Sequence, residues 1–360
     1  MANEKKIIAY KGFDKDFKCR DFQYEVGKTY EMDGNIKCCD RGFHACESPM
    51  EVFDYYDMLT SRFAVVEQSG KIDIEESSTK VCSSRIKIKA ELKLADIIKL
   101  GVEWLKEITV PSKIEADNSS NEGDYAQIGS SGDYAQIGSS GDYAKIGSSG
   151  DYAKIGSSGD SAQIGSSGDS AQIGSSGYSA KIGSSGDYAQ IGSSGDYAKI
   201  GSSGYYAQIG SSGYSAQIGS SGDYAQIGSS GYSAKIGSSG DSAKIGSSGD
   251  YAQIGSSGDY AQIGSSGDSA QIGSSGDYAK IGSSGYYAKI DSSGQNSVVM
   301  CAGYNSKAKA AIGSWITLAE WRKVEDTWKP VCVKTEQVDG EHIKADTYYK
   351  LINGKFEEVE

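Results

Sequence analysis

Aspartate and tyrosine recur at nine-residue spacing through the middle of this 360-residue chain, from Gly123 to Gly294. Written from its glycine, each unit reads Gly-(Asp/Tyr)-(Tyr/Ser)-Ala-(Gln/Lys)-Ile-Gly-Ser-Ser, and the isoleucine occurs nineteen times, from Ile128 to Ile290. Carboxylates in a regular row are ligands for calcium or mimics of nucleic-acid phosphates, whereas tyrosines in a row offer rigid, amphipathic contact area. The chemistry of the array therefore depends on which side chains reach solvent.

Calcium binding is the first alternative, because calcium-binding β-rolls also have a nine-residue unit, G-G-x-G-x-D-x-U-x. In this chain serine replaces the second glycine, and the aspartate falls one place early. Five units carry tyrosine instead of that aspartate: Tyr178, Tyr205, Tyr214, Tyr232 and Tyr286. Calcium needs a dense shell of oxygen ligands, which the loss of carboxylates would remove. The aspartate is better explained as a turn former, and we expect neither a metal nor another cofactor.

Substitutions among the units separate buried from exposed positions. The second, third and fifth positions vary, whereas alanine, isoleucine and both serines never change, and one glycine alone is replaced, by Asp291. Residues two apart in a strand share a face, so alanine and isoleucine should face a core and the third and fifth positions should face solvent. A disordered Gly/Ser tract would not make this distinction. The pattern predicts a mainly β fold, a solenoid of stacked strands.

The size of the expected core favours a two-sided parallel β-solenoid (β-helix) with about 18 residues per coil. A three-sided coil would enclose an interior too wide for alanine and isoleucine, whereas two sheets about 10 Å apart suit them. The substitutions leave both forms open, because Tyr178, Tyr205 and Tyr232 are 27 residues apart but Tyr214 breaks that rhythm. The packing argument therefore favours the two-sided coil.

A coil of about 18 residues places alternate units on the two faces, so that one face should stack seven tyrosines. With interruptions at Ser170 and Ser242, they are Tyr134, Tyr152, Tyr188, Tyr206, Tyr224, Tyr260 and Tyr278. This face should carry eight aspartates and three lysines, a net charge of −5, against −1 opposite. We predict that it is a binding strip; the alternative is that the tyrosines only support one another as cross-strand pairs.

The charge of the chain, −12, argues against direct binding of nucleic acid. A slender acidic rod could imitate DNA, and the array has fifteen aspartates against eight lysines, a net charge of −7. A rod of nine and a half coils is roughly 45 Å long, and a DNA duplex of that length carries about 26 charges. The rod would therefore carry about a quarter of the charge of the duplex, so its imitation of DNA would be weak. Binding to ice or another crystal lattice is a further alternative, since the array predicts a flat, regular face.

The segments around the array predict four further regions. They are an N-terminal α+β domain (1–110), a linker (111–122), a cap (295–319) after the solenoid (123–294), and a small β-hairpin module (320–360). In the first domain, KKIIAYKGF, SRFAVVEQ and CSSRIKIKAELKL predict strands, LADIIKLGVEWLKEI predicts a helix, and Ser48 should cap a short helix at PMEVFDYYDML. In the cap, Ala310, Ile312 and Gly313 restore the motif after a four-residue slip. Asn353-Gly354 predicts a hairpin turn.

The N-terminal domain also contains residues suited to metal binding or catalysis. Cys19, Cys38, Cys39, His44 and Cys46 could bind zinc, but their spacing lacks paired C-x2-C knuckles, so buried thiols are expected. YKGF followed by GFHACESPMEVFDYY resembles the strand and strand–turn–helix of ADP-ribosyltransferase-type folds. The resemblance implies an enzyme in residues 1–110, and His44 and Glu91 are the residues on which its chemistry could be built. It is the alternative to our main expectation, which is a protein without catalytic activity.

YKGFDKDFKCRDFQYEVGKTYE, CCDRGFHACESP, the IGSSGDYA array and SKAKAAIGSWITLAEW together resemble uncharacterised phage and prophage proteins of Gram-positive bacteria. The resemblance implies a viral origin, a host protein as partner and an anti-defence role. The chain begins without an apolar segment typical of signal peptides and has no run of about 18 apolar residues. We therefore expect a cytoplasmic protein with free thiols and no membrane association. The terminal domains could form a homo-oligomer.

Overall fold

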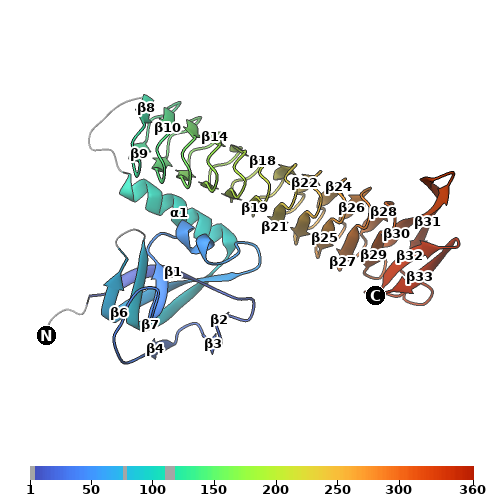
Figure 1. The fold of residues 1–360 in the computed structure, drawn as a ribbon, viewed down its shortest axis with the longest axis horizontal. Helices are drawn as coiled ribbons and strands as arrows, with labels where there is room; N and C mark the ends of the chain where they lie inside the picture. Colours follow the sequence, from blue (N-terminus) through green and yellow to red (C-terminus); the bar gives the residue numbers. More distant parts are fainter. Residues whose placement is uncertain (1–4, 76–78, 110–117) are drawn as a thin grey trace. The chain divides into compact units, whose positions relative to one another are not determined.

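The computed structural model describes residues 5–75, 79–109 and 118–360 (Figure 1). The chain divides between Val110 and Pro111 into two compact units, an N-terminal unit and the solenoid unit. Of the predicted linker, 111–117 lies outside the described residues. The rest enters the rod, because β8 (Asn118–Asn121) pairs in parallel with β10 (Gln136–Ser139).

The N-terminal unit has a five-stranded antiparallel sheet in the order β4-β7-β5-β1-β6, and β6 also pairs with β7. Its strands are β1 (Ile7–Phe13), β4 (Thr29–Glu31), β5 (Phe43–Cys46), β6 (Arg62–Ile74) and β7 (Lys80–Leu92). A small hairpin joins β2 (Lys18–Cys19) to β3 (Phe22–Gln23). The three strands predicted from sequence are confirmed as β1, β6 and β7.

The helices of the N-terminal unit agree with the sequence in one case and differ in the other. α1 (Leu94–Ile108) is the predicted helix, and its residues at helical spacing, Ile97, Ile98, Val102 and Leu105, are buried. The predicted cap at Ser48 is wrong. The short helix η1 (Met50–Asp54) is a 3-10 helix that begins after Pro49 and has no side-chain cap. Pro49 occupies the N-cap position, and Met50 is the first residue of the helix.

The solenoid unit is a two-sided parallel β-solenoid of about 11 turns at 18-residue spacing, which confirms the predicted coil. One sheet contains β8, β10, β12 (Lys154–Ser157), β14 (Gln172–Ser175), β16 (Gln190–Ser193), β18 (Gln208–Ser211), β20 (Gln226–Ser229), β22 (Lys244–Ser247), β24 (Gln262–Ser265), β26 (Lys280–Ser283), β28 (Val298–Cys301), β30 (Trp315–Val324) and β31 (Thr327–Gln337). We call it the even sheet.

The other sheet, the odd sheet, completes each coil. It contains β9 (Gln127–Ser130), β11 (Lys145–Ser148), β13 (Gln163–Ser166), β15 (Lys181–Ser184), β17 (Lys199–Ser202), β19 (Gln217–Ser220), β21 (Lys235–Ser238), β23 (Gln253–Ser256), β25 (Gln271–Ser274), β27 (Lys289–Ser292), β29 (Lys307–Ala310), β32 (Tyr348–Ile352) and β33 (Lys355–Val359). Strands of the two sheets alternate along the array, so each sheet gains one strand every 18 residues.

The core of the solenoid consists of identical residues in register. Ile209 lies beside Ile191 and Ile227 in the even sheet and is 3% exposed. The alanine before each strand from β10 onward along the repeats is also buried, as predicted. The first serine of each pair, such as Ser211, is a third core residue that the sequence analysis did not assign. It lies two positions after the isoleucine and therefore shares its face.

The third position of the repeat differs from its prediction. It lies in a turn before the strand, not on an outward face of the sheet, and Tyr134 has a φ of 61° there. The glycine that opens this turn is packed against its equivalent in the preceding coil. A Cβ on Gly213 would lie 1.9 Å from the carbonyl oxygen of Gly195, which explains why this glycine does not vary.

At the C-terminal end, the expected four-residue slip is wrong. β29 pairs with β27 so that Ala308 lies beside Ile290, which keeps the nine-residue period through Ala310. Two hairpins then close the rod: β30 and β31 extend the even sheet, while β32 and β33 extend the odd sheet. The predicted turn at Asn353-Gly354 is confirmed, and both residues have positive φ as such turns require.

Candidate functional site

The seven tyrosines predicted as a binding strip lie one above another in the turns that precede the even-sheet strands. We call these turns, from Asp133 to Tyr278, the tyrosine edge. Ring centroids are 5.1 Å apart for Tyr134 and Tyr152, and 5.2 Å for Tyr260 and Tyr278. Ser170 and Ser242 interrupt the stack at the places predicted from sequence.

The middle of the tyrosine edge holds its densest group of rings. Tyr188 and Tyr224 stack on Tyr206 from either side, with centroids 5.3 and 5.0 Å away. Tyr205, which replaces an aspartate, adds its ring edge-on, 4.5 Å from Tyr206. Burial among these rings, followed by the charges of Tyr224 and Tyr206, raises the pKa of Tyr205 to about 12. The Tyr205 hydroxyl therefore stays uncharged at neutral pH.

These rings are held by strained backbone. All seven tyrosines of the edge have φ between 56° and 61°, in the left-handed region that L-residues other than asparagine, aspartate and histidine seldom adopt. One coil beyond Tyr278 the same turn position is filled by Asn296, with φ of 53°. The turn itself thus has no need of tyrosine, since asparagine and serine also occupy it.

The aspartates of the same turns have a structural task. Asp133 Oδ1 accepts the backbone N–H of Asp151 at 3.0 Å, and Asp223 Oδ1 accepts that of Asp241 at 2.8 Å. Where tyrosine replaces aspartate the donor remains, as in the bond from the Tyr205 N–H to Asp187 Oδ1. Each aspartate therefore links its turn to the next coil. Among the residues that the structure describes, no cluster of His, Cys, Asp or Glu side chains could hold a metal ion.

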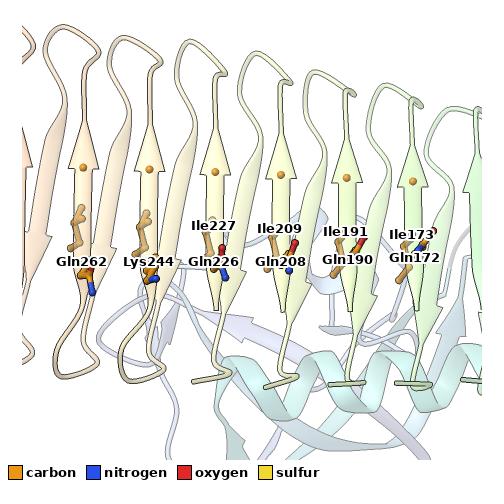
Figure 2. Close-up of a pocket in the computed structure, with 18 of the residues that line it drawn as sticks. Gln172, Ile173, Gln190, Ile191, Gln208, Ile209, Gln226, Ile227, Lys244 and Gln262 are labelled. Atoms are coloured by element: carbon orange, nitrogen blue, oxygen red, sulfur yellow. The ribbon is translucent and has the colours of Figure 1, made fainter. Parts of the chain in front are cut away.

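Lysines and aspartates do not share a face, contrary to the charge count made from sequence. The aspartates lie in the turns, whereas the fifth-position lysines point outward from the sheets. On the even sheet they accompany glutamines along a groove of about 1720 Å³ that runs across the strands, as Figure 2 shows for Gln190, Gln208 and Gln226. The charged residues that line this groove are Lys154, Lys244 and Lys280.

The floor of the groove is a row of outward-facing glycines. A Cβ added to Gly210 would meet nothing within 4 Å, and the same holds for its equivalents from Gly138 to Gly282 in the even sheet. Side chains would therefore fit, yet the repeats keep glycine. The sequence contains this signal, in a position that changes once among nineteen units, but the substitution pattern alone did not assign this glycine to a face. We call this surface the glycine groove.

The second turn of each coil forms an opposite, less regular edge. Tyr125 stacks on Tyr143 with centroids 5.1 Å apart, and Tyr214 stacks on Tyr232 at 5.2 Å. Here tyrosine occupies both the second and the third positions of the repeat. Because the ring comes from the second position in some units and from the third in others, the tyrosine stack on this edge is interrupted more often than the stack on the tyrosine edge.

In the N-terminal unit, the structure does not bring together His44 and Glu91. His44 pairs with Cys82 on β7, nine residues before Glu91, a separation of roughly 30 Å along the strand. Both Glu91 carboxylate oxygens accept hydrogen bonds from Arg62 at 2.7 Å. His44 Nε2 accepts the Cys39 N–H at 3.0 Å, a bond that joins β5 to the loop before it.

The cysteines considered as zinc ligands are free thiols in different surroundings. Cys46 is buried, which raises its pKa to about 12, and the nearby carboxylates of Glu51 and Asp54 act in the same direction. Cys39 is exposed, and Cys19 Sγ lies 3.0 Å from the Tyr56 hydroxyl. As noted, they form no metal-binding cluster in the described part of the chain.

Comparison with known proteins reaches the N-terminal unit only. Residues 7–100 match a domain of unknown function, DUF7666. No curated protein and no solved structure matches the chain. The DUF7666 match spans the sheet and the first seven of the fifteen residues of α1, and leaves out the array. In the described residues, no helix has the length and apolar character needed to cross a membrane.

Proposed function

We propose that this chain is a non-enzymatic interaction protein that presents its tyrosine edge to a macromolecular partner. The observation that carries the proposal is the placement of seven exposed tyrosines in left-handed backbone. That conformation costs an L-residue about 1–2 kcal/mol, so tyrosine opposes the turn that holds it. Strained residues that persist where a cheaper residue fits are typical of functional positions.

The chemistry of the edge suits protein recognition. Tyrosine combines a large apolar ring with a hydroxyl and has few rotatable bonds, so little entropy is lost when it becomes ordered in an interface. The group formed by Tyr188, Tyr205, Tyr206 and Tyr224 supplies a central aromatic patch, and aspartates flank it in the same turns. Aromatic anchors with a polar rim are the usual composition of binding hot spots.

We propose that the partner is a host protein. This chain would then be a phage-derived protein that blocks a host defence. The acidic turns support this choice over nucleic acid, whose phosphates they would repel. In the alternative, imitation of DNA, the carboxylates themselves would bind the partner. Asp133 and Asp223 already accept backbone N–H groups, which supports a role in turn geometry instead.

A flat lattice-binding surface is the second candidate, and the glycine groove is the observation that favours it. Its identical units repeat at the strand spacing across the even sheet. A thermal hysteresis measurement decides this candidate. Ice binding predicts a freezing gap that grows with protein concentration, and the absence of a gap removes it.

Affinity capture with two matched triple variants tests the main proposal. The first replaces Tyr188, Tyr206 and Tyr224 by serine, which fills that turn position in seven units. The second is the control, with lysine at Gln190, Gln208 and Gln226 on the neighbouring glycine groove.

The partner captured by the wild-type chain should bind the tyrosine variant at least about ten-fold more weakly, and the control with unchanged affinity. Both variants should keep the wild-type melting temperature. Unchanged binding by a folded tyrosine variant would refute the proposal. Loss of binding in the control variant alone would show that the partner binds at the glycine groove instead of the tyrosine edge.

A further inference from the structure

The N-terminal unit contains a pocket of about 1130 Å³ that the proposed binding function does not use. It opens between β1, β5 and the β2–β3 hairpin, and its walls are largely aromatic. The aromatic rings that line it include those of Tyr10, Phe22, Tyr24, Tyr30, Phe43, Tyr55 and Tyr56. Gly12 lets one of them approach the backbone of β1, since a Cβ there would lie 2.3 Å from the Tyr56 ring. Pockets of this size with aromatic walls are typical of small-molecule sites.

Lys11 lies in this pocket and is 5% exposed. Its Nζ donates hydrogen bonds to the His44 carbonyl oxygen at 3.0 Å and to Cys19 Sγ at 3.5 Å. The ammonium also lies 5.6 Å from the ring centroid of Phe13 and 5.8 Å from that of Tyr24. In the part of the chain that the structure describes, no carboxylate lies within ion-pair distance of this nitrogen.

A buried ammonium without a carboxylate is unfavourable, because removal from water is not offset by an opposite charge. Burial is the main influence that lowers the pKa of Lys11, and the positive charge of Arg20 adds to it. Methionine or leucine would fill the same space with less loss of free energy. The lysine therefore has a purpose other than stability, and a bound anion would supply the missing charge.

We propose that this pocket binds a small molecule that carries a phosphate or carboxylate group on a planar ring. The anionic group contacts Lys11 on the pocket floor, and the ring packs among the aromatic walls. Arg20 and Arg41 line the same pocket, are exposed, and have no ion pair among the described residues. They add positive charge at the rim, which they share with the exposed carboxylates of Asp21, Asp40 and Glu31, the last of which is paired with Arg85.

Calorimetric titration of the full chain with four probes tests this site. Phenyl phosphate and benzoate carry both an anion and a ring, inorganic phosphate carries only the anion, and benzyl alcohol carries only the ring. We expect saturable binding of at least one of the first two probes, and binding at least several-fold weaker for the last two. The two ring-bearing anions also separate a phosphate site from a carboxylate site.

Two variants link the binding to the pocket. Lys11→Met should weaken the binding of the better probe by roughly ten-fold or more, since charge-assisted hydrogen bonds to the anion are lost. Arg20→Gln, at an exposed position that carries little risk to folding, should weaken it by a few-fold. Benzyl alcohol that binds as tightly as benzoate, no saturable binding by either ring-bearing anion, or unaltered affinity in both variants would each overturn the proposal.

Discussion

The two units of this protein bury different polar side chains. In the solenoid, the isoleucines of the repeat and its alanines from Ala135 onward are buried together with serine hydroxyls, and the varied residues lie in turns or on outward faces. In the N-terminal unit, one strand places Lys11 beside the buried Ala9 and Phe13. In the repeat, the residues that stabilise the fold and the residues proposed to bind a partner are therefore different ones. In the N-terminal unit, residues of both kinds lie in the same core. Surface changes in the solenoid should leave its stability intact, but a change at the pocket should alter binding and stability together.

The largest expected effect comes from a change in the solenoid core. Ile209→Asp should destabilise the rod by at least about 4 kcal/mol, because it removes a buried side chain and places an unpaired carboxylate between the sheets. Gln208→Lys, one residue away, should leave stability within about 0.5 kcal/mol. Thermal melts of the two variants check this separation. Equal melting temperatures would mean that inward and outward positions have been confused.

Two glycines three residues apart provide the next test. Gly213→Ala should cost about 3 kcal/mol, since its Cβ would lie 1.9 Å from the Gly195 carbonyl oxygen. Gly210→Ala, in the glycine groove, should leave stability unchanged or raise it by up to about 1 kcal/mol, because nothing lies within 4 Å of the added atom. Urea denaturation gives both values. A similar loss from both substitutions would show that the groove glycines serve the fold.

The pocket of the N-terminal unit should show the opposite relation between function and stability. Lys11 has a lowered pKa in the folded state, so its protonation destabilises the fold at neutral pH and has no effect above about 10.5, where the unfolded lysine is also neutral. The stability of Lys11→Met relative to wild type should therefore be greatest near pH 7 and decline as pH rises to 10.5.

Hydrogen exchange of β1 in both proteins measures that difference. Burial lowers the pKa of His44 from 6.5 and raises the pKa values of Cys46, Tyr24 and Tyr56, that of Cys46 to about 12, so these four groups titrate outside this pH range. Cys19 and Arg20 also lie near Lys11 in both proteins. A difference that stays constant over this pH range, or that grows, would mean that Lys11 is not a destabilising charge.

The smallest effect is expected on the tyrosine edge. Tyr278→Asn puts into this turn the residue that Asn296 supplies one coil later, and it relieves the left-handed strain of tyrosine. The gain is offset by loss of the stack with Tyr260, so the net change should stay within about 1 kcal/mol. A differential scanning melt checks it. A loss of several kcal/mol would mean that the tyrosines are needed for folding.

The sequence predicted the solenoid because a repeated core is a local pattern. Nineteen isoleucines at one phase define the strands, and the volumes of isoleucine and alanine define a two-sided coil. The two-residue alternation of a strand does not extend into a turn, which is why Tyr134 was assigned to a face instead of an edge. The slip expected near Ala310 had a similar cause, since Ala308 fills the isoleucine position without resembling it.

The pocket around Lys11 could not be predicted, because its residues are brought together from β1, β5 and the loops between them. A lysine in the strand KKIIAYKGF looks like a solvent-facing residue until the pairing of β1 with β6 and β5 is known. The glycine groove was visible as a position that does not vary. Whether this glycine is exposed, however, depends on which side of the strand faces the core. The sequence pattern assigned a core-facing side to isoleucine and alanine alone.

Site-specific photo-crosslinking tests the central claim most directly, which is that the tyrosine edge serves binding and the core serves folding. A photoreactive phenylalanine replaces Tyr206 on the edge in one protein and Gln208 on the even sheet in another, and both are irradiated in lysate of the host. The account predicts one discrete crosslinked product from position 206 and none from position 208, with both proteins folded. A product from position 208 alone, or none from position 206 under conditions in which the wild-type chain captures its partner, would contradict it.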